Sequence, residues 1–203
     1  MNLDFIEFSD TDYDKIVVFI HGWIGNKASF KSIASIMKIK KVKWLFPQAP
    51  YKMNNENEEY SWASENADGT FEVKKTVDLF SVFLKENVLS LVDSTKVFFI
   101  GFSQGATICY DFILQLEHPW GGVFPVAGFK RNRKSFFTIH ENQKKTPIII
   151  GHGLKDKIIP IASSENIYNE LQNNDFNVSF EKFNGGHKIN VNYLKKIQSV
   201  ING

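Results

Sequence analysis

The chain has 203 residues, of which 43% are hydrophobic and 14% aromatic, and its 24 Lys and Arg residues nearly balance its 22 Asp and Glu residues. This composition predicts one globular domain over residues 1–203 and argues against disorder. The net charge of +2 provides no basic surface for a nucleic acid, and no apolar run approaches the ~18 residues that cross a bilayer. We therefore expect neither a nucleic-acid partner nor stable membrane insertion.

The first residues and the single cysteine bear on location and on bound groups. Residues 1–5 carry neither the basic start nor the long apolar run of a signal peptide, so we expect a cytoplasmic protein. Cys109 is the only cysteine, which leaves no internal disulfide and no cysteine-based metal site. We expect no metal ion and no other cofactor.

Strands and helices are expected to alternate along the chain. Apolar runs of β-forming residues predict strands at 3–8, 15–20, 42–46, 97–100, 121–128, 147–150 and 178–183. Apolar residues spaced three or four apart predict helices at 30–37, 73–91, 106–116, 161–171 and 189–201. This alternation predicts an α/β fold with a mostly parallel central sheet and helices on both faces. At this length the fold should lack a separate lid domain.

Three stretches depart from the regular pattern. Pro125 should end or distort the strand at 121–128, because proline cannot donate to a central ladder. Residues 51–69 form the longest irregular stretch, which either covers a site or is a solvated loop. Residues 129–145 form a basic connection, which is either a solvated face or a cradle for an anionic substrate. The helix at 73–91 has Thr70 as its expected N-cap.

A serine stands at the turn between the strand at 97–100 and the helix that follows it. Gly101 and Gly105 flank Ser103 at the spacing G-x-S-x-G. A serine pushed out of such a turn has a strained backbone, and side chains two residues away on either side would clash. The turn places the Ser103 hydroxyl above the sheet, at the positive end of the next helix. The pattern is short, so it indicates a nucleophile only if the chain also supplies a base, an acid and an oxyanion hole.

Two further polar residues follow predicted strands. Asp156 comes after the strand at 147–150, and His187 comes after the strand at 178–183, so both should meet Ser103 at one edge of the sheet. A serine hydroxyl needs a base to take its proton, and an imidazole can do this near neutral pH. A carboxylate would fix the tautomer of that imidazole. The chain order serine, acid, histidine is the order found in α/β-hydrolases.

Other residues compete for these roles. Asp175 is a second candidate acid, but it follows a helix and not a strand. His187 is favoured as the base because only this histidine follows the last strand with glycines before it. The histidines beside glycines at earlier strand ends are expected to be structural, and the other two adjoin a helix end or lie in the basic connection. These four residues are His21, His152, His118 and His140.

Backbone N–H groups beside the serine could stabilise an oxyanion. Trp23, in a glycine-containing loop after the strand at 15–20, and Gln104, directly after the serine, are the candidate donors. The alternative for the Trp23 loop is an ordinary strand-to-helix turn. The side chains of Trp23, Trp62 and Phe102 are candidate walls of the substrate pocket.

Several segments together resemble a known family. Residues 101–106 (Gly-Phe-Ser-Gln-Gly-Ala), residues 147–160 and the sequence Gly185-Gly186-His187 resemble the phospholipase/carboxylesterase branch of the α/β-hydrolases, which includes the acyl-protein thioesterases. Residues 46–50, followed by Trp62, resemble the Pro-x-Ala-Pro segment and downstream tryptophan of that branch. The resemblance extends over most of the chain.

The chain departs from the family pattern at two places. After its first core strand the branch usually has His-Gly-x-Gly-Asp, whereas residues 21–26 read His-Gly-Trp-Ile-Gly-Asn and are one residue longer. Ala63 and Ser64 follow Trp62, where the branch often has Phe-Asp. These departures bear on the oxyanion loop and on the substrate.

The catalytic residues and the resemblance imply a serine hydrolase that needs no metal. It would cleave small to medium acyl esters or thioesters of small-molecule substrates through an acyl-enzyme on Ser103. One alternative is acyl-protein thioesterase or lysophospholipase activity on fatty acyl chains. A further alternative is a binding protein of hydrolase fold without turnover.

Overall fold

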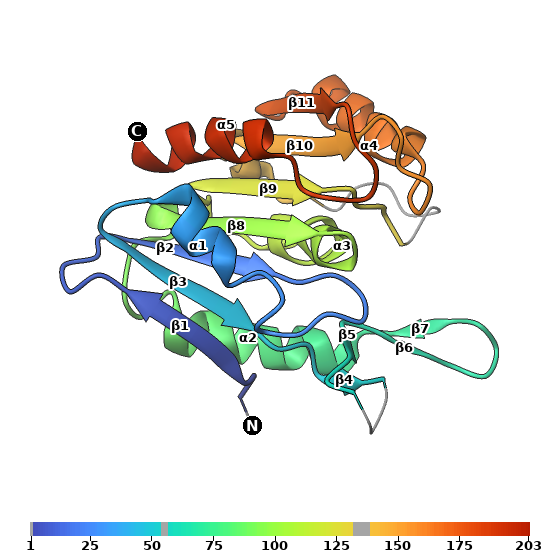
Figure 1. The fold of residues 1–203 in the computed structure, drawn as a ribbon, viewed down its shortest axis with the longest axis horizontal. Coiled ribbons are helices and arrows are strands. Elements are labelled where there is room, and N and C mark those ends of the chain that lie inside the picture. Colours follow the sequence, from blue (N-terminus) through green and yellow to red (C-terminus); the bar gives the residue numbers. More distant parts are fainter. Residues whose placement is uncertain (1, 54–56, 132–138) are drawn as a thin grey trace.

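A seven-stranded sheet runs through the computed structural model, which describes residues 2–53, 57–131 and 139–203 (Figure 1). The strand order is β1-β3-β2-β8-β9-β10-β11. Only the edge strand β1 is antiparallel to its neighbour, and the other paired strands are parallel. The strands are β1 (Phe5–Ser9), β2 (Lys15–Ile20), β3 (Val42–Pro47), β8 (Val97–Phe102), β9 (Gly122–Val126), β10 (Ile148–Gly153) and β11 (Val178–Phe183).

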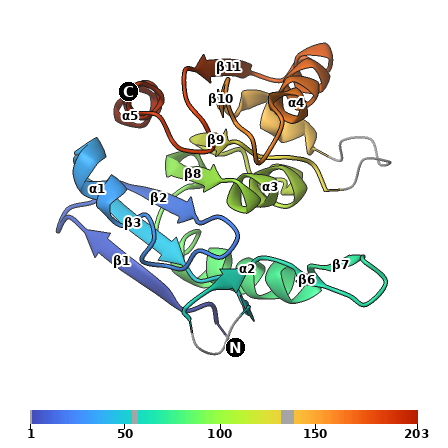
Figure 2. The same cartoon turned by 45° about the vertical axis from the view of Figure 1, so that its right-hand side comes forward.

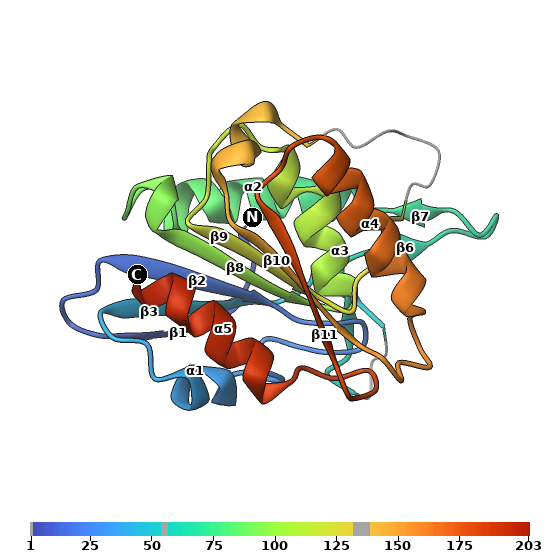
Figure 3. The same cartoon turned by 90° about the horizontal axis from the view of Figure 1, so that it is seen from above.

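Helices cover both faces of the sheet. Seen from above, α1 (Ser32–Met37) and α5 (Val191–Asn202) lie on one face, and α2 (Lys74–Asn87), α3 (Gln104–Asp111) and α4 (Ile161–Asn173) lie on the other (Figure 3). Successive side chains of β2 alternate between two apolar cores, one under each helical layer. This explains why the inner strands are apolar on both faces. The predicted α/β architecture is confirmed, and the half-exposed β11 is the expected edge strand.

Residues 51–69 contain more regular structure than the sequence predicts. They form the hairpin β4 (Tyr51–Lys52) and β5 (Tyr60–Ser61) and the start of a second hairpin, β6 (Ser64–Glu65) and β7 (Phe71–Glu72). The second hairpin projects from the body of the molecule (Figure 2). Short 3-10 helices occupy Ser94–Lys96, Ile113–Gln115 and Glu141–Lys145.

Several helix boundaries differ from the prediction, among them the end of α2, which lies at Asn87 and not at residue 91. Thr70 is not a helix cap, because it lies in the turn of the β6–β7 hairpin, where its hydroxyl donates to Asp68 Oδ1 over 2.6 Å. The helix begins later, at Lys74, with Val73 at the N-cap position. The helix α3 ends at Asp111, and a 3-10 turn replaces its expected last residues. Among the described residues, no helix is both long enough and apolar enough to cross a membrane.

The strand β9 continues through Pro125, contrary to the prediction. Val123 N donates to Pro147 O and Ala127 N donates to Gly151 O, so the register directs the missing N–H of residue 125 at Ile149 O. The Tyr193 hydroxyl, from α5, donates to Ile149 O over 2.7 Å. A side chain from the covering helix therefore replaces the hydrogen bond that proline removes from the sheet.

Replacing Tyr193 by phenylalanine should destabilise the fold by about 1 to 3 kcal/mol, because it leaves the Ile149 carbonyl buried without a donor. Urea unfolding of the variant measures this loss. Tyr168→Phe on α4 is the matched control, since Tyr168 is only partly buried. Equal losses of free energy in the two variants would show that the Ile149 hydrogen bond has no special role. Adding Pro125→Val to Tyr193→Phe should recover part of the loss, since valine restores an N–H aimed at Ile149 O.

Candidate active site

Ser103 sits at a sharp turn between β8 and α3. Its backbone has φ 53° and ψ −115°, a left-handed φ that is uncommon for a residue with a side chain. The turn is held by a hydrogen bond of 2.8 Å from Ser103 N to Val126 O. A Cβ atom on Gly105 would lie 2.1 Å from Ile20 O, and one on Gly101 would lie 2.5 Å from Gly105 O. Close backbone packing therefore accounts for both flanking glycines.

Asp156 lies in the loop after β10 and holds His187. Its Oδ1 accepts from Ile158 N at 2.8 Å and from Ile159 N at 3.0 Å, and its Oδ2 is 2.7 Å from His187 Nδ1. Burial by itself would raise the pKa of Asp156, but the hydrogen bonds from His187 and from the two amides together hold that pKa below its usual value. An ionised carboxylate can only accept, so His187 Nδ1 donates to it, and Nε2 is the nitrogen that a neutral imidazole would offer as an acceptor.

The loops that carry Asp156 and His187 are joined by backbone contacts. Leu154 N donates to Phe183 O, and Lys155 N donates to Gly185 O. The His187 ring contacts Phe102, the residue before the serine, with ring centroids 4.8 Å apart. The structure thus places all three predicted catalytic residues at the carboxyl edge of the sheet. Asp175, the alternative acid, lies in the turn between α4 and β11, at the opposite edge.

The loop after β2 lies beside the serine. A Cβ atom on Gly22 would be 3.4 Å from Ser103 Cβ, so the Gly22–Trp23 peptide is close to the nucleophile. Gln104 is the first residue of α3, and its N–H therefore has no partner within the helix. These are the two peptides from which the sequence predicts oxyanion donors. The Trp23 side chain is 58% exposed and the neighbouring Ile24 is 51% exposed.

Trp62 does not wall a pocket in this structure, contrary to the expectation. It is 0% exposed, and its indole packs against His21 and Phe80. Its Nε1 donates to His21 O at 2.9 Å, and its backbone N donates to Gln104 Oε1 at 2.8 Å. The Gln104 amide also donates to Ser61 Oγ. Trp62 and the Gln104 side chain therefore tie β5 to the turn that carries the serine, a role that the sequence did not reveal.

The buried His21 ring joins the loop after β2 to the segment after β3. Its Nε2 accepts from Ala49 N at 3.1 Å, so its Nδ1 carries the proton and donates to Gly22 O at 2.7 Å. Burial lowers the pKa of His21 to about 4, although the bond to Gly22 opposes this shift. The ring is therefore neutral at neutral pH. The expected structural role of His21 consists of its two hydrogen bonds, one to Ala49 and one to Gly22.

We expect His21 to make the fold sensitive to acid. Below its ordinary pKa of 6.5 the unfolded chain takes up a proton at this ring, while the folded chain does so only near pH 4. The unfolded state binds more protons in this window, so stability falls as pH drops from about 6.5 to about 4, by about 3 kcal/mol in total.

Chemical denaturation at several pH values tests this expectation. His21→Gln keeps an acceptor for Ala49 N but does not titrate, and it should have a flatter dependence of stability on pH. Burial also lowers the pKa of His152, and this shift makes stability fall with decreasing pH in the wild type and in His21→Gln alike. Parallel pH dependences for the wild type and His21→Gln would contradict the assignment.

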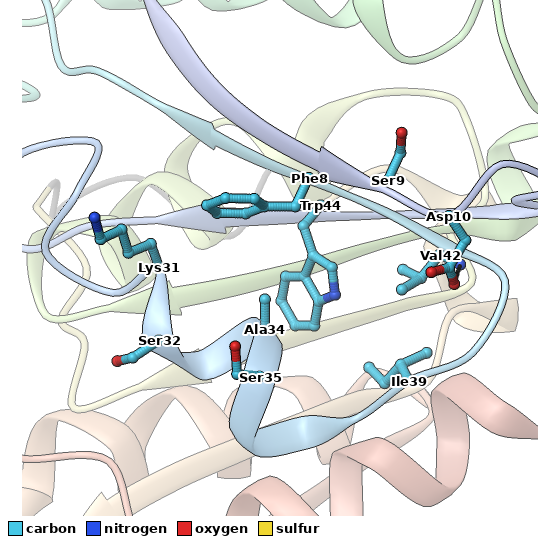
Figure 4. Close-up of a pocket in the computed structure, with 10 residues that line it drawn as sticks. All are labelled: Phe8, Ser9, Asp10, Lys31, Ser32, Ala34, Ser35, Ile39, Val42 and Trp44. Carbon is cyan, nitrogen blue, oxygen red and sulfur yellow. Dashed lines mark hydrogen bonds between the residues drawn. The ribbon is translucent and has the colours of Figure 1, made fainter.

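A cavity of about 510 Å³ lies under α1, away from the candidate active site (Figure 4). Its lining includes the end of β1 at Ser9, the start of β3 at Val42 and the indole of Trp44. Because the start of β3 marks the amino edge of the parallel strands, this cavity does not adjoin the edge at which Ser103 lies.

The basic connection is described only in part. Arg131 places its guanidinium 5.2 Å from the centre of the Phe71 ring in the β6–β7 hairpin. Lys130 Nζ lies 3.8 Å from Glu170 Oε1. Arg133 and Lys134, which belong to the predicted cradle or solvated face, lie outside the described residues.

Comparison with known proteins places the chain in a family. A sequence model of the phospholipase/carboxylesterase family matches residues 1–203. The chain belongs to this family. Acyl-protein thioesterase 1 of Kluyveromyces lactis is 26% identical over 162 residues, which cover 72% of this chain and 71% of that protein. Carboxylesterase SOBER1 of Arabidopsis thaliana is 26% identical over 202 residues, which cover 91% of this chain and 88% of that protein.

Solved structures agree with this family assignment at the level of the fold. The Bacillus cereus carboxylesterase superposes with a TM-score of 0.81 at 20% identity, covering 98% of this chain and 93% of that one. Arabidopsis thaliana SOBER1 superposes with a TM-score of 0.77 at 22% identity, covering 93% and 97%. The predicted α/β-hydrolase fold and the prediction of an ester-hydrolysing enzyme are confirmed.

Proposed function

We propose that the chain is a serine hydrolase that cleaves carboxylic esters or thioesters through an acyl-enzyme on Ser103. The observation that carries this proposal is the 2.7 Å contact between the buried Asp156 carboxylate and His187, beside a serine on a strained turn. An unprotonated Nε2 on an imidazole held by a carboxylate is the base that a serine hydroxyl requires.

The proposed reaction has two halves. His187 Nε2 takes the Ser103 proton while the serine oxygen bonds to the acyl carbon, and the N–H groups of Trp23 and Gln104 donate to the resulting oxyanion. The oxyanion then collapses, the bond to the leaving alcohol or thiol breaks, and that group takes the proton from His187. In the second half, water loses a proton to His187 and attacks the acyl carbon. The bond to the Ser103 oxygen then breaks, that oxygen takes the proton from His187, and the acid is released.

Apolar side chains near the candidate site support an apolar acyl group. Trp23 and Ile24 follow β2, and Leu154 and Ile158 follow β10. The exposed fractions of Leu154 and Ile158 are 56% and 67%. Small to medium acyl groups remain the preferred substrates, because the described residues form no separate lid domain. The similarity to an acyl-protein thioesterase favours fatty acyl chains as the alternative. The cytoplasmic location remains a prediction.

Two measurements on the wild-type protein test the proposal. A fluorophosphonate probe should label one serine, and mass spectrometry should assign the adduct to Ser103. Hydrolysis of p-nitrophenyl esters from acetate to palmitate should give an optimum at a short or medium chain, whereas an optimum at palmitate would favour the alternative. A folded protein that neither reacts with the probe nor hydrolyses any of the esters would contradict the proposal and favour a binding protein.

A further inference from the structure

His152 is a fully buried histidine that the proposed reaction does not use directly. It lies on β10, four residues before Asp156, and both of its ring nitrogens are engaged. Nδ1 is 2.8 Å from Ser164 Oγ on α4, and Nε2 is 2.9 Å from the backbone oxygen of Ile159. The ring therefore bridges α4 and the loop that carries the acid.

These partners determine where the proton of the His152 ring lies. A backbone carbonyl can only accept, so Nε2 carries the proton and donates to Ile159 O. Nδ1 is then the acceptor for the Ser164 hydroxyl, and Ser164 is itself fully buried. Burial also lowers the pKa of His152, in keeping with a neutral ring. The result is a directed chain of donors from Ser164 through His152 to Ile159.

The residue that accepts from His152 also holds the acid. Ile159 accepts from His152 at its carbonyl oxygen, and its N–H, which belongs to the preceding peptide group, donates to Asp156 Oδ1. His152 Nε2 also lies 3.5 Å from Asp156 Oδ2, the oxygen that holds His187. That distance is too long for a good hydrogen bond, but it places a ring that carries an N–H beside the carboxylate. His152 therefore holds a residue that bonds to Asp156 Oδ1 and itself lies beside Asp156 Oδ2.

We propose that His152 is a positioning residue, which holds the Asp156 carboxylate in the orientation that fixes the His187 ring for proton transfer. This inference rests on the proposed function for its kinetic consequences. The geometric claim, that His152 sets the Asp156–His187 hydrogen bond, stands independently of any activity. A misplacement of about 1 Å in such a supporting contact can lower a rate by about 100-fold.

Two substitutions at His152 separate the effect of its N–H donor from the effect of its side-chain volume. In His152→Gln the terminal amide can place an N–H near the position of Nε2, whereas His152→Leu fills similar space without a donor. We expect His152→Leu to lower kcat by about 10- to 100-fold with KM changed less than about twofold, and His152→Gln to retain kcat within about threefold. The low-field proton NMR signal of His187 Nδ1–H should persist in His152→Gln and weaken or shift in His152→Leu.

A third variant covers the case in which His152→Leu does not fold. Ser164→Ala keeps the ring but removes the donor to Nδ1, and we expect kcat to fall by about threefold to tenfold with a shifted His187 signal. A folded His152→Leu with wild-type kcat and an unchanged His187 signal would overturn the proposal. If His152→Leu is unfolded, wild-type kcat and an unchanged signal in Ser164→Ala would overturn it instead.

The NMR measurement distinguishes a failure of the positioning role of His152 from a failure of the proposed function. A wild-type protein without esterase activity, or without probe adduct at Ser103, contradicts the hydrolase assignment. The His187 signal in the variants still decides whether His152 positions Asp156.

Discussion

Ser103→Ala is expected to lower kcat for p-nitrophenyl esters by about 10⁶-fold while leaving KM within a few-fold of the wild-type value. The substitution removes the atom that forms the acyl bond, while His187 and Asp156 keep their 2.7 Å contact. Residual hydrolysis would come from water that is activated within the bound complex and from the oxyanion donors. Steady-state kinetics with ester and thioester substrates measure the loss.

The folded state should survive this change. Ser103 already occupies a positive φ, and alanine has a similar steric cost there, so the unfolding midpoint should move by only a few degrees. The fluorophosphonate adduct should disappear from the variant. Retention of more than about one per cent of the wild-type kcat, after removal of contaminating hydrolases, would show that another residue is the nucleophile.

Asp156→Asn is expected to lower kcat by about 10⁴-fold, with little change in KM. The asparagine oxygen can keep the bonds from Ile158 N and Ile159 N, which leaves its NH₂ group facing His187. A donor would then face a donor, and His187 would shift its proton from Nδ1 to Nε2. The imidazole could no longer accept the serine proton. Kinetics over a range of pH, together with the His187 NMR signal, would measure both consequences.

Asp175→Asn is the matched control. The residue lies at the opposite edge of the sheet with φ 61°, a conformation that asparagine also tolerates. Its kcat should stay within about twofold of the wild type, and its stability should change little. Equal losses of kcat in the Asp156 and Asp175 variants would remove the basis for assigning the acid to Asp156.

Structural roles distinguish the five histidines more clearly than their sequence context does. His21 and His152 are both buried, are both neutral and both bond at each ring nitrogen. Their opposite tautomers follow from their partners, because His21 Nε2 meets a backbone N–H and His152 Nε2 meets a backbone carbonyl. Among the described histidines, His187 is the one whose Nδ1 lies 2.7 Å from a buried carboxylate oxygen. Sequence reasoning separated these classes through the neighbouring glycines, but it could not predict the tautomers.

Local chemistry made much of the fold and the candidate site predictable. Apolar strands alternate with amphipathic helices along the chain, and the apolar pattern within each element shows which of its residues are buried. These patterns predicted the parallel sheet and its two helical layers. The glycines around Ser103 were informative because their spacing is visible within five residues. Only the clash at Gly101 arises within that turn, since a Cβ atom on Gly105 would meet Ile20 O at the end of β2. The positions of Asp156 and His187 after strands were informative because parallel strands end at the same edge.

The remaining features depend on contacts between residues far apart in the chain. A proline in an inner strand is a defect in any local pattern, and it is tolerated because Tyr193 supplies the hydrogen bond to Ile149 O. The sequence suggested that Trp62 lines the substrate pocket. In the structure Trp62 is completely buried, and its two N–H groups donate to His21 O and Gln104 Oε1. Periodicity and spacing predicted elements and candidate residues, because those signals act over one or two turns. Long-range packing determined which buried polar groups meet, because each such group must find a partner and only the folded chain brings the two together.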